Sequence, residues 1–171
     1  AYEVWLPLYA LLHLCQARFD HLPAPWQRVF PARVPPVSSL NTQACPRTPL
    51  KIGLVWQANP LAPTARRRNV PVAQLSQWMH EMAGATATAD QGRPLKFYGL
   101  QYQPLEPLPT GPNFEDLSES LTDFAVTAAY VQQMDVLVTV DTVMAHLGAT
   151  LGVHVCLLLS YVADWRWLSR A

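Results

Sequence analysis

The sequence predicts an α/β fold, in which a Rossmann-like parallel sheet carries helices on both faces. The first observation is a series of short apolar runs of strand length, at residues 51–56, 95–100, 135–140 and 153–159. Such runs are typical of parallel strands that are buried on both faces. The second observation is the helical apolar spacing between these runs, and the third is the shortness of the links. This alternation favours right-handed crossovers within one sheet.

The first half of the predicted sheet holds two strands and one long helix. The run at 51–56 leads into a loop that contains three consecutive arginines, Arg66, Arg67 and Arg68. Pro71 suits the first turn of a helix, because its fixed backbone angle matches that position. The apolar face of this helix is expected from Val72, Leu75, Trp78, Met79 and Met82.

The second half repeats the alternation without prolines. The sequence predicts a helix at residues 121–134, with Thr122 or Asp123 as its N-cap. After the next strand, a short helix of small residues is expected at 143–151. It ends at Gly152, a residue type at which helices stop.

Composition indicates one compact domain preceded by a linker. The chain has 171 residues, 50% of them hydrophobic and 14% charged. All 16 prolines lie at or before Pro112, and the basic residues are concentrated in the same part of the chain. We expect residues 1–49 to be the remnant of a preceding domain, including an apolar piece at 4–19, and a proline-rich linker. Residues 50–171 form the Rossmann-like domain, so the proline boundary is not a domain border.

Several classes of protein are excluded. No apolar run reaches the roughly eighteen residues of a membrane span, and a signal peptide's basic leader is missing. Cys15, Cys45 and Cys156 form no CxxC pair, so we expect reduced cysteines, no metal site and a cytoplasmic location. A net charge of zero gives no argument for nucleic acid. Dinucleotide and P-loop fingerprints are absent, and Cys156 is expected to be inaccessible inside its apolar strand.

Ligands of open parallel sheets bind beyond the carboxyl ends of the strands. One such end delivers Asp141 and Thr142 to the start of a helix, where backbone amides and the helix dipole favour an anion such as a diphosphate. His146 lies one turn further on the same helix face. Small residues nearby, Ala145, Gly148 and Ala149, are expected to let the helix approach the sheet. The alternative is that Asp141 caps the helix and His146 is a packed, hydrogen-bonded residue.

The loop after the first strand is expected to face the same edge. It contains Asn59, Arg66 and Arg68, and guanidinium groups match phosphate oxygens in bidentate geometry. Gln101 follows the second strand. The alternative for the arginines is a solvated run of charge. Convergence of the two loops favours the functional interpretation.

These segments, taken together, resemble one family. They are 52–56 (IGLVW) with Asn59-Pro60, the three arginines, Leu100-Gln101, 121–124 (LTDF), 140–142 (VDT) with 145–147 (AHL), and 161–167 (YVADWRW). They are similar to the C-terminal glycosyltransferase-B-like domain of bacterial tetratricopeptide-repeat proteins, which is akin to the heptosyltransferases. The resemblance covers roughly residues 50 to 168. One departure is Gln57-Ala58, where the family usually has Ala-Gly.

The resemblance implies a site for a nucleotide-diphosphate sugar, which is a donor substrate rather than a cofactor. It implies that Asp141, Thr142 and the amides leading to His146 hold the diphosphate. Arg68 would neutralise the diphosphate charge, and Gln101 would lie near the nucleoside. It also implies an upstream acceptor domain, which supplies the general base, or an upstream tetratricopeptide array. No catalytic residue is therefore assigned here.

Two functions remain open from the sequence. The first is the donor-binding domain of a glycosyltransferase, an enzyme that transfers a sugar to a protein or glycan acceptor. This domain is expected to be inactive alone. The second is a non-catalytic interaction module of a tetratricopeptide-repeat protein, suggested by the altered Gln57-Ala58 loop and the tryptophan-bearing end of the chain. A small hydrolase is disfavoured, because the sequence offers neither a nucleophile nor a metal cluster.

Overall fold

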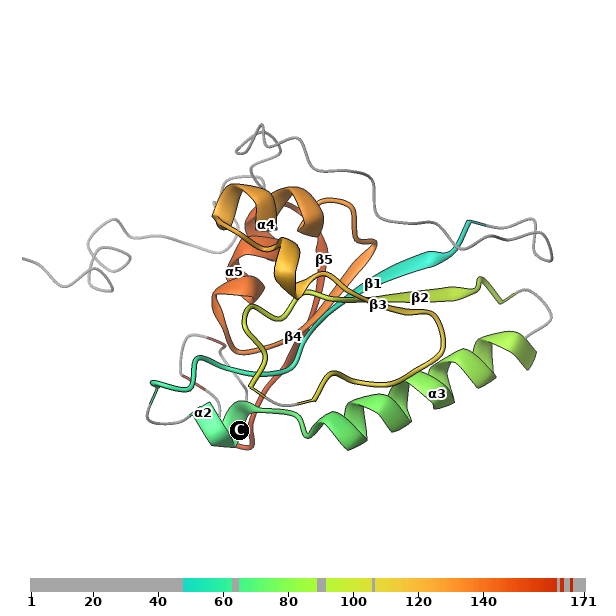
Figure 1. Cartoon of the computed structure of the whole chain (residues 1–171), viewed down its shortest axis with the longest axis horizontal. Coiled ribbons are helices and arrows are strands. Elements are labelled where there is room, and N and C mark those ends of the chain that lie inside the picture. Colours follow the sequence, from blue (N-terminus) through green and yellow to red (C-terminus); the bar gives the residue numbers. More distant parts are fainter. Residues whose placement is uncertain are drawn as a thin grey trace, which may run out of the picture.

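A computed structural model describes residues 48–62, 65–88, 92–105, 107–162, 164 and 167. Within this part of the chain, five strands form one parallel sheet in the order β3-β2-β1-β4-β5 (Figure 1). The predicted fold class is confirmed. Strands on both sides of Pro112 share the sheet, as expected. The strands are β1 (Leu50–Val55), β2 (Leu95–Gly99), β3 (Phe114–Asp116), β4 (Val136–Val140) and β5 (His154–Leu158).

Helices cover both faces of the sheet. The long helix α3 packs on one face, and α4 and α5 pack together on the other (Figure 1). A single-turn helix, α2, lies in the loop after β1, and a 3₁₀ turn, η2, follows β3. Their bounds are α2 (Ala65–Arg68), α3 (Val72–Thr88), η2 (Ser118–Ser120), α4 (Phe124–Val131) and α5 (Val143–Thr150).

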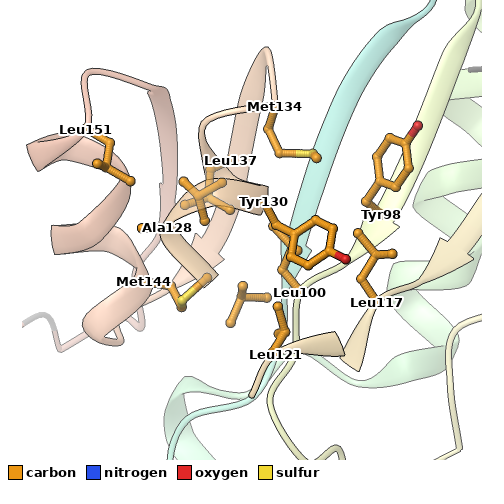
Figure 2. Close-up of a cluster of buried hydrophobic side chains, with 12 residues drawn as sticks. Tyr98, Leu100, Leu117, Leu121, Ala128, Tyr130, Met134, Leu137, Met144 and Leu151 are labelled. Carbon is orange, nitrogen blue, oxygen red and sulfur yellow. The ribbon is translucent and has the colours of Figure 1, made fainter. Parts of the chain in front are cut away.

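Two apolar clusters hold these layers together. Leu75 and Met79 of α3 pack on Phe97 of β2, and the ring of Trp78 meets Phe97 edge to face at 5.8 Å. On the other face, side chains of α4 and α5 gather over the sheet (Figure 2). Tyr98 belongs to this second cluster. Burial, and secondarily the charge of Glu115, raise the pKa of Tyr98 to about 12, so its phenol stays neutral in the core.

Helix α4 begins at Phe124 rather than at Leu121, and the choice between its two predicted N-caps is resolved. Asp123, not Thr122, caps α4, because its Oδ1 accepts the Val126 N–H at 2.8 Å. The helix ends earlier than expected, at Val131. Beyond it, Met134 N–H bonds Val131 O, three residues back, which tightens the chain out of the α-helix. Gly152 has φ 76°, which confirms the predicted stop after α5.

Three local expectations are wrong. The arginine segment is a helical turn rather than a loop, and Ala149 is exposed although Ala145 and Gly148 are buried against the sheet. Cys156 is a free thiol, as expected, but it is exposed rather than inaccessible. Its strand, β5, ends the sheet order, and α3 packs over the other half of that face.

Strand β3 has no counterpart in the sequence analysis. It is three residues long and pairs only with β2. The proline-rich connection before it runs along α3, where Thr110 N–H donates to Ser76 Oγ at 3.0 Å. A segment this short lacks the apolar run by which strands are recognised.

Other expectations fall outside the described residues. These are the apolar piece at 4–19, most of the proline-rich linker, Cys15 and Cys45. The division at residues 49 and 50 therefore stays a prediction. Among the described residues, no helix has the length and apolarity to cross a membrane, and no group of three potential metal ligands occurs.

Candidate functional site

The strand order places a topological switch point between β1 and β4. These neighbours pair from Ile52↔Val136 to Val55↔Thr139. The chain leaves β1 toward α3 on one face and leaves β4 toward α5 on the other. In open α/β sheets, ligands bind outside the carboxyl ends of the strands at such a point. The residues after β1 and β4 are therefore the ones to consider.

Arg68 bridges this switch point. From α2, its Nη1 donates to the backbone oxygen of Asp141 at 2.9 Å and lies 3.5 Å from Asp141 Oδ2. The two residues are 73 positions apart in the chain. The structure thus brings the predicted Arg68 and Asp141 together, from two loops that the sequence places at one edge.

The guanidinium of Arg68 is incompletely satisfied. Its side chain is 20% exposed and that of Asp141 is 9% exposed. Arg68 Nε is buried, and no described residue accepts its hydrogen. A buried donor without a partner costs free energy, because the water it has lost is not replaced. A bound oxyanion would supply that partner, and guanidinium groups take phosphate oxygens in bidentate fashion.

Helix α5 adds a second attraction for an anion at the same edge. Thr142 is its N-cap, and Thr142 Oγ1 accepts the Met144 N–H at 3.3 Å. Asp141 precedes this cap, so the Arg68 contact sits beside the positive end of the helix dipole. The Arg68 guanidinium and the N-terminus of α5, which Thr142 caps, can together hold a negatively charged group.

Side-chain amides fix the loop that carries Arg68. Gln101 Oε1 accepts two backbone N–H groups, those of Trp56 at 3.2 Å and Gln57 at 2.9 Å. Asn69 Oδ1 accepts the Ala58 N–H at 2.8 Å, and Gln57 Oε1 accepts the Leu105 N–H at 3.1 Å. Gln57, at one of the two positions that depart from the resembled domains, ties the loop after β1 to the loop after β2.

Gln101 stays a predicted nucleoside contact. Its carbonyl oxygen is already shared by the two N–H groups, and its Nε2 lies 3.4 Å from Tyr102 O. Asn69 was not singled out in the sequence. The position of Asn69 after the three arginines is a weak sequence signal, because an asparagine in an exposed loop gives the same pattern.

The contacts described for the other predicted residues involve neither Arg68 nor Asp141. Asn59 is exposed, and its Oδ1 accepts the Leu61 N–H within the same loop. Arg66 is exposed on α2. His146 is exposed on α5, and its ring stacks on Trp167 with centroids 5.0 Å apart and planes at 21°. The stack lies one turn past Thr142. The predicted roles of Asn59, Arg66 and His146 stay predictions.

Comparisons with known proteins add one structural likeness. No protein-family model and no curated protein sequence matches the chain. Among solved structures, the chain is similar to the glycosyl transferase family 9 from Veillonella parvula DSM 2008, with 15% identity and a TM-score of 0.46. The match covers 67% of this chain and 31% of that chain. A likeness this distant carries no argument of its own. The fold rests on the strand order, and the site rests on its contacts.

Proposed function

We propose that this domain binds the diphosphate of a nucleotide sugar, as the donor-binding domain of a glycosyltransferase. The observation that carries the proposal is the Arg68–Asp141 contact across the switch point, with Arg68 Nε buried and unpartnered among the described residues. A phosphate oxygen at Nε would satisfy this donor, and the N-terminus of α5 lies beside it to hold the second phosphate.

Such a site is suited to the chemistry of sugar transfer. Negative charge grows on the nucleoside diphosphate as the bond to the sugar breaks. A guanidinium and a helix N-terminus that are already in place stabilise that charge without reorganising. The sequence resemblance to glycosyltransferase-B-like domains supports transfer of a sugar as the reaction.

On this proposal, the domain holds the donor and does not act alone. Asp141 is the acidic side chain at the centre of the site, but it is buried and already paired with Arg68, so we do not assign it as the general base. The family resemblance assigns the general base and the acceptor, a protein or a glycan, to another domain.

Calorimetry with a panel of nucleoside diphosphates and their sugars tests the proposal. We expect binding by the parent, and an affinity about 10- to 100-fold weaker in Arg68→Ala, because a charge-assisted hydrogen bond is lost. Arg67→Ala is the matched control. Arg67 lies on the same turn and carries the same charge, but it is exposed. Equal affinities for Arg68→Ala and the parent, or no binding of any of these compounds, would refute the proposal.

A second function is favoured by the apolar side chains at the site edge. The strand and helix ends at this edge carry large exposed apolar residues, and such groups mark interaction surfaces. They are Leu61, Tyr102, Leu105, Phe124, Val143, Tyr161 and Val162. On this alternative, the domain is a non-catalytic docking module. A defined partner that binds the parent but not Leu105→Asp, without nucleotide binding, would support it. Nucleotide binding that depends on Arg68 counts against it.

A further inference from the structure

We propose that Asn69 is the positioning residue of the anion site, acting through Arg68; the proposal rests on the function proposed above. Asn69 carries no charge, and we assign it no direct contact with the ligand. It closes the loop from which Arg68 reaches Asp141. The residue is half-buried and directly follows Arg68 in the chain.

The loop after β1 is closed at a narrow neck by two hydrogen bonds. Val70 N–H donates to Trp56 O at 2.9 Å, which joins the end of the loop to the end of β1. Ala58 N–H donates to Asn69 Oδ1 at 2.8 Å, one step further into the loop. The first bond is between backbone groups, so only the second depends on a side chain.

The neck fixes where α2 stands relative to β4. Asn69 N–H bonds Ala65 O at 3.2 Å, so Asn69 also ends the turn that carries the arginines. One residue therefore terminates α2 with its backbone and anchors it to β1 with its side chain. Arg68 is the last residue of that turn, and its guanidinium must cross to a neighbouring strand to meet Asp141.

Loss of the neck bond has a direct consequence for binding. Without an acceptor at Oδ1, the Ala58 N–H loses its partner, and the loop loses the side-chain bond that closes it. Because Arg68 and Asn69 are adjacent, the guanidinium moves with the loop. Misplacing a preorganised charge weakens its interaction with an anion even when the charge remains.

Asn69→Leu removes the acceptor while keeping a side chain of similar shape. Two readouts are measured in the full chain. The first is modification of Arg68 by phenylglyoxal, followed by mass spectrometry that separates it from Arg66 and Arg67. The second is the affinity for inorganic pyrophosphate. We expect Arg68 to react severalfold faster in the variant, and the affinity to fall by about tenfold.

Two further variants separate positioning from stability. Asn69→Asp keeps an acceptor oxygen, so Arg68 should recover the protection seen in the parent. Ser76→Ala also removes a side chain that accepts a distant backbone N–H, from Thr110, but on α3 away from the switch point. It should change neither readout. If Asn69→Leu does not fold, Asn69→Ala removes the same acceptor with less added bulk.

The outcomes distinguish this inference from the proposed function. Unchanged Arg68 reactivity in folded Asn69→Leu or Asn69→Ala overturns the positioning role, whether or not the parent binds pyrophosphate. Faster Arg68 reactivity with rescue by Asn69→Asp supports that role. If the parent binds neither pyrophosphate nor any nucleoside diphosphate, the proposed function fails, and the reactivity data still decide how Arg68 is held.

Discussion

The two ends of the central strands each carry an arginine–aspartate pair, and the pairs differ in kind. At the carboxyl end, Arg68 and Asp141 are largely buried, and Arg68 Nε finds no acceptor in the described structure. At the amino end, Arg93 Nη2 lies 4.0 Å from Asp135 Oδ2, with side chains 46% and 44% exposed. Arg93 also donates to Thr48 O at 3.1 Å, through Nε. The same residue types thus form a buried contact with an unpartnered Nε at one end and a solvent-exposed ion pair at the other.

This difference is the reason that we propose the ligand site at the carboxyl end. Exposed ion pairs contribute little to stability, because water competes for both charges. Asp135 at the amino end is also used structurally, since its Oδ2 accepts the Lys51 N–H at 2.8 Å. A buried guanidinium with a donor to spare costs stability unless something binds it. The carboxyl end therefore carries a cost that a bound anion would offset.

The largest expected difference is in the stability of the alanine variants at the two ends. Arg68→Ala leaves the buried Asp141 carboxylate without its partner, and we expect a loss of about 2–3 kcal/mol in the free energy of unfolding. Arg93→Ala should cost less than about 1 kcal/mol, because its pair is solvated. Denaturant unfolding of both variants measures this.

Double substitution provides the control for that comparison. Arg68→Ala with Asp141→Asn removes both charges and should recover part of the lost stability, whereas Arg93→Ala with Asp135→Asn should not recover any. Equal losses for Arg68→Ala and Arg93→Ala would show that burial does not separate the two pairs.

A smaller effect is expected from the glycine that sets how close α5 lies to the sheet. A Cβ at Gly148 would lie 2.7 Å from Leu137 Cδ2 and 3.0 Å from Val155 Cγ2. Gly148→Ala should therefore cost about 1–2 kcal/mol through overpacking. Since α5 carries Thr142 at its start, the variant should also weaken nucleotide binding at the carboxyl edge.

Gly84 of α3 is the matched helical glycine. A Cβ there meets nothing within 4 Å, so Gly84→Ala should stabilise the domain by about 0.5–1 kcal/mol and leave binding unchanged. Thermal unfolding of the two variants, with calorimetry of each, checks both statements. Destabilisation by Gly84→Ala as large as that by Gly148→Ala would contradict the close approach of α5 as the cause.

The sequence predicts much of the fold, because the features that make it are local. Apolar runs locate β1, β2, β4 and β5, and small residues with a terminal glycine locate α5. Parallel strands carry their following residues to one edge, so the meeting of Arg68 and Asp141 is also foreseeable in outline. The sequence does not reveal which residue forms a hydrogen bond or ion pair with each polar side chain.

The unforeseen features all depend on contacts between distant segments. Strand β3 exists because three residues find the edge of β2. Gln101 and Asn69 hold backbone N–H groups 45 and 11 positions away, respectively, which no residue pattern announces. Cys156 is exposed because of where β5 falls in the sheet order, although its own run of residues is apolar.

The most direct test of the central claim follows the side-chain Nε–Hε resonances of Arg68 and Arg93 during titration with a nucleoside diphosphate. The Arg68 signal is assigned from its loss in Arg68→Ala, and the Arg93 signal from its loss in Arg93→Ala. The account predicts that the Arg68 resonance moves to lower field and saturates with the ligand, while that of Arg93 stays in place. Binding that leaves the Arg68 resonance unmoved would contradict it.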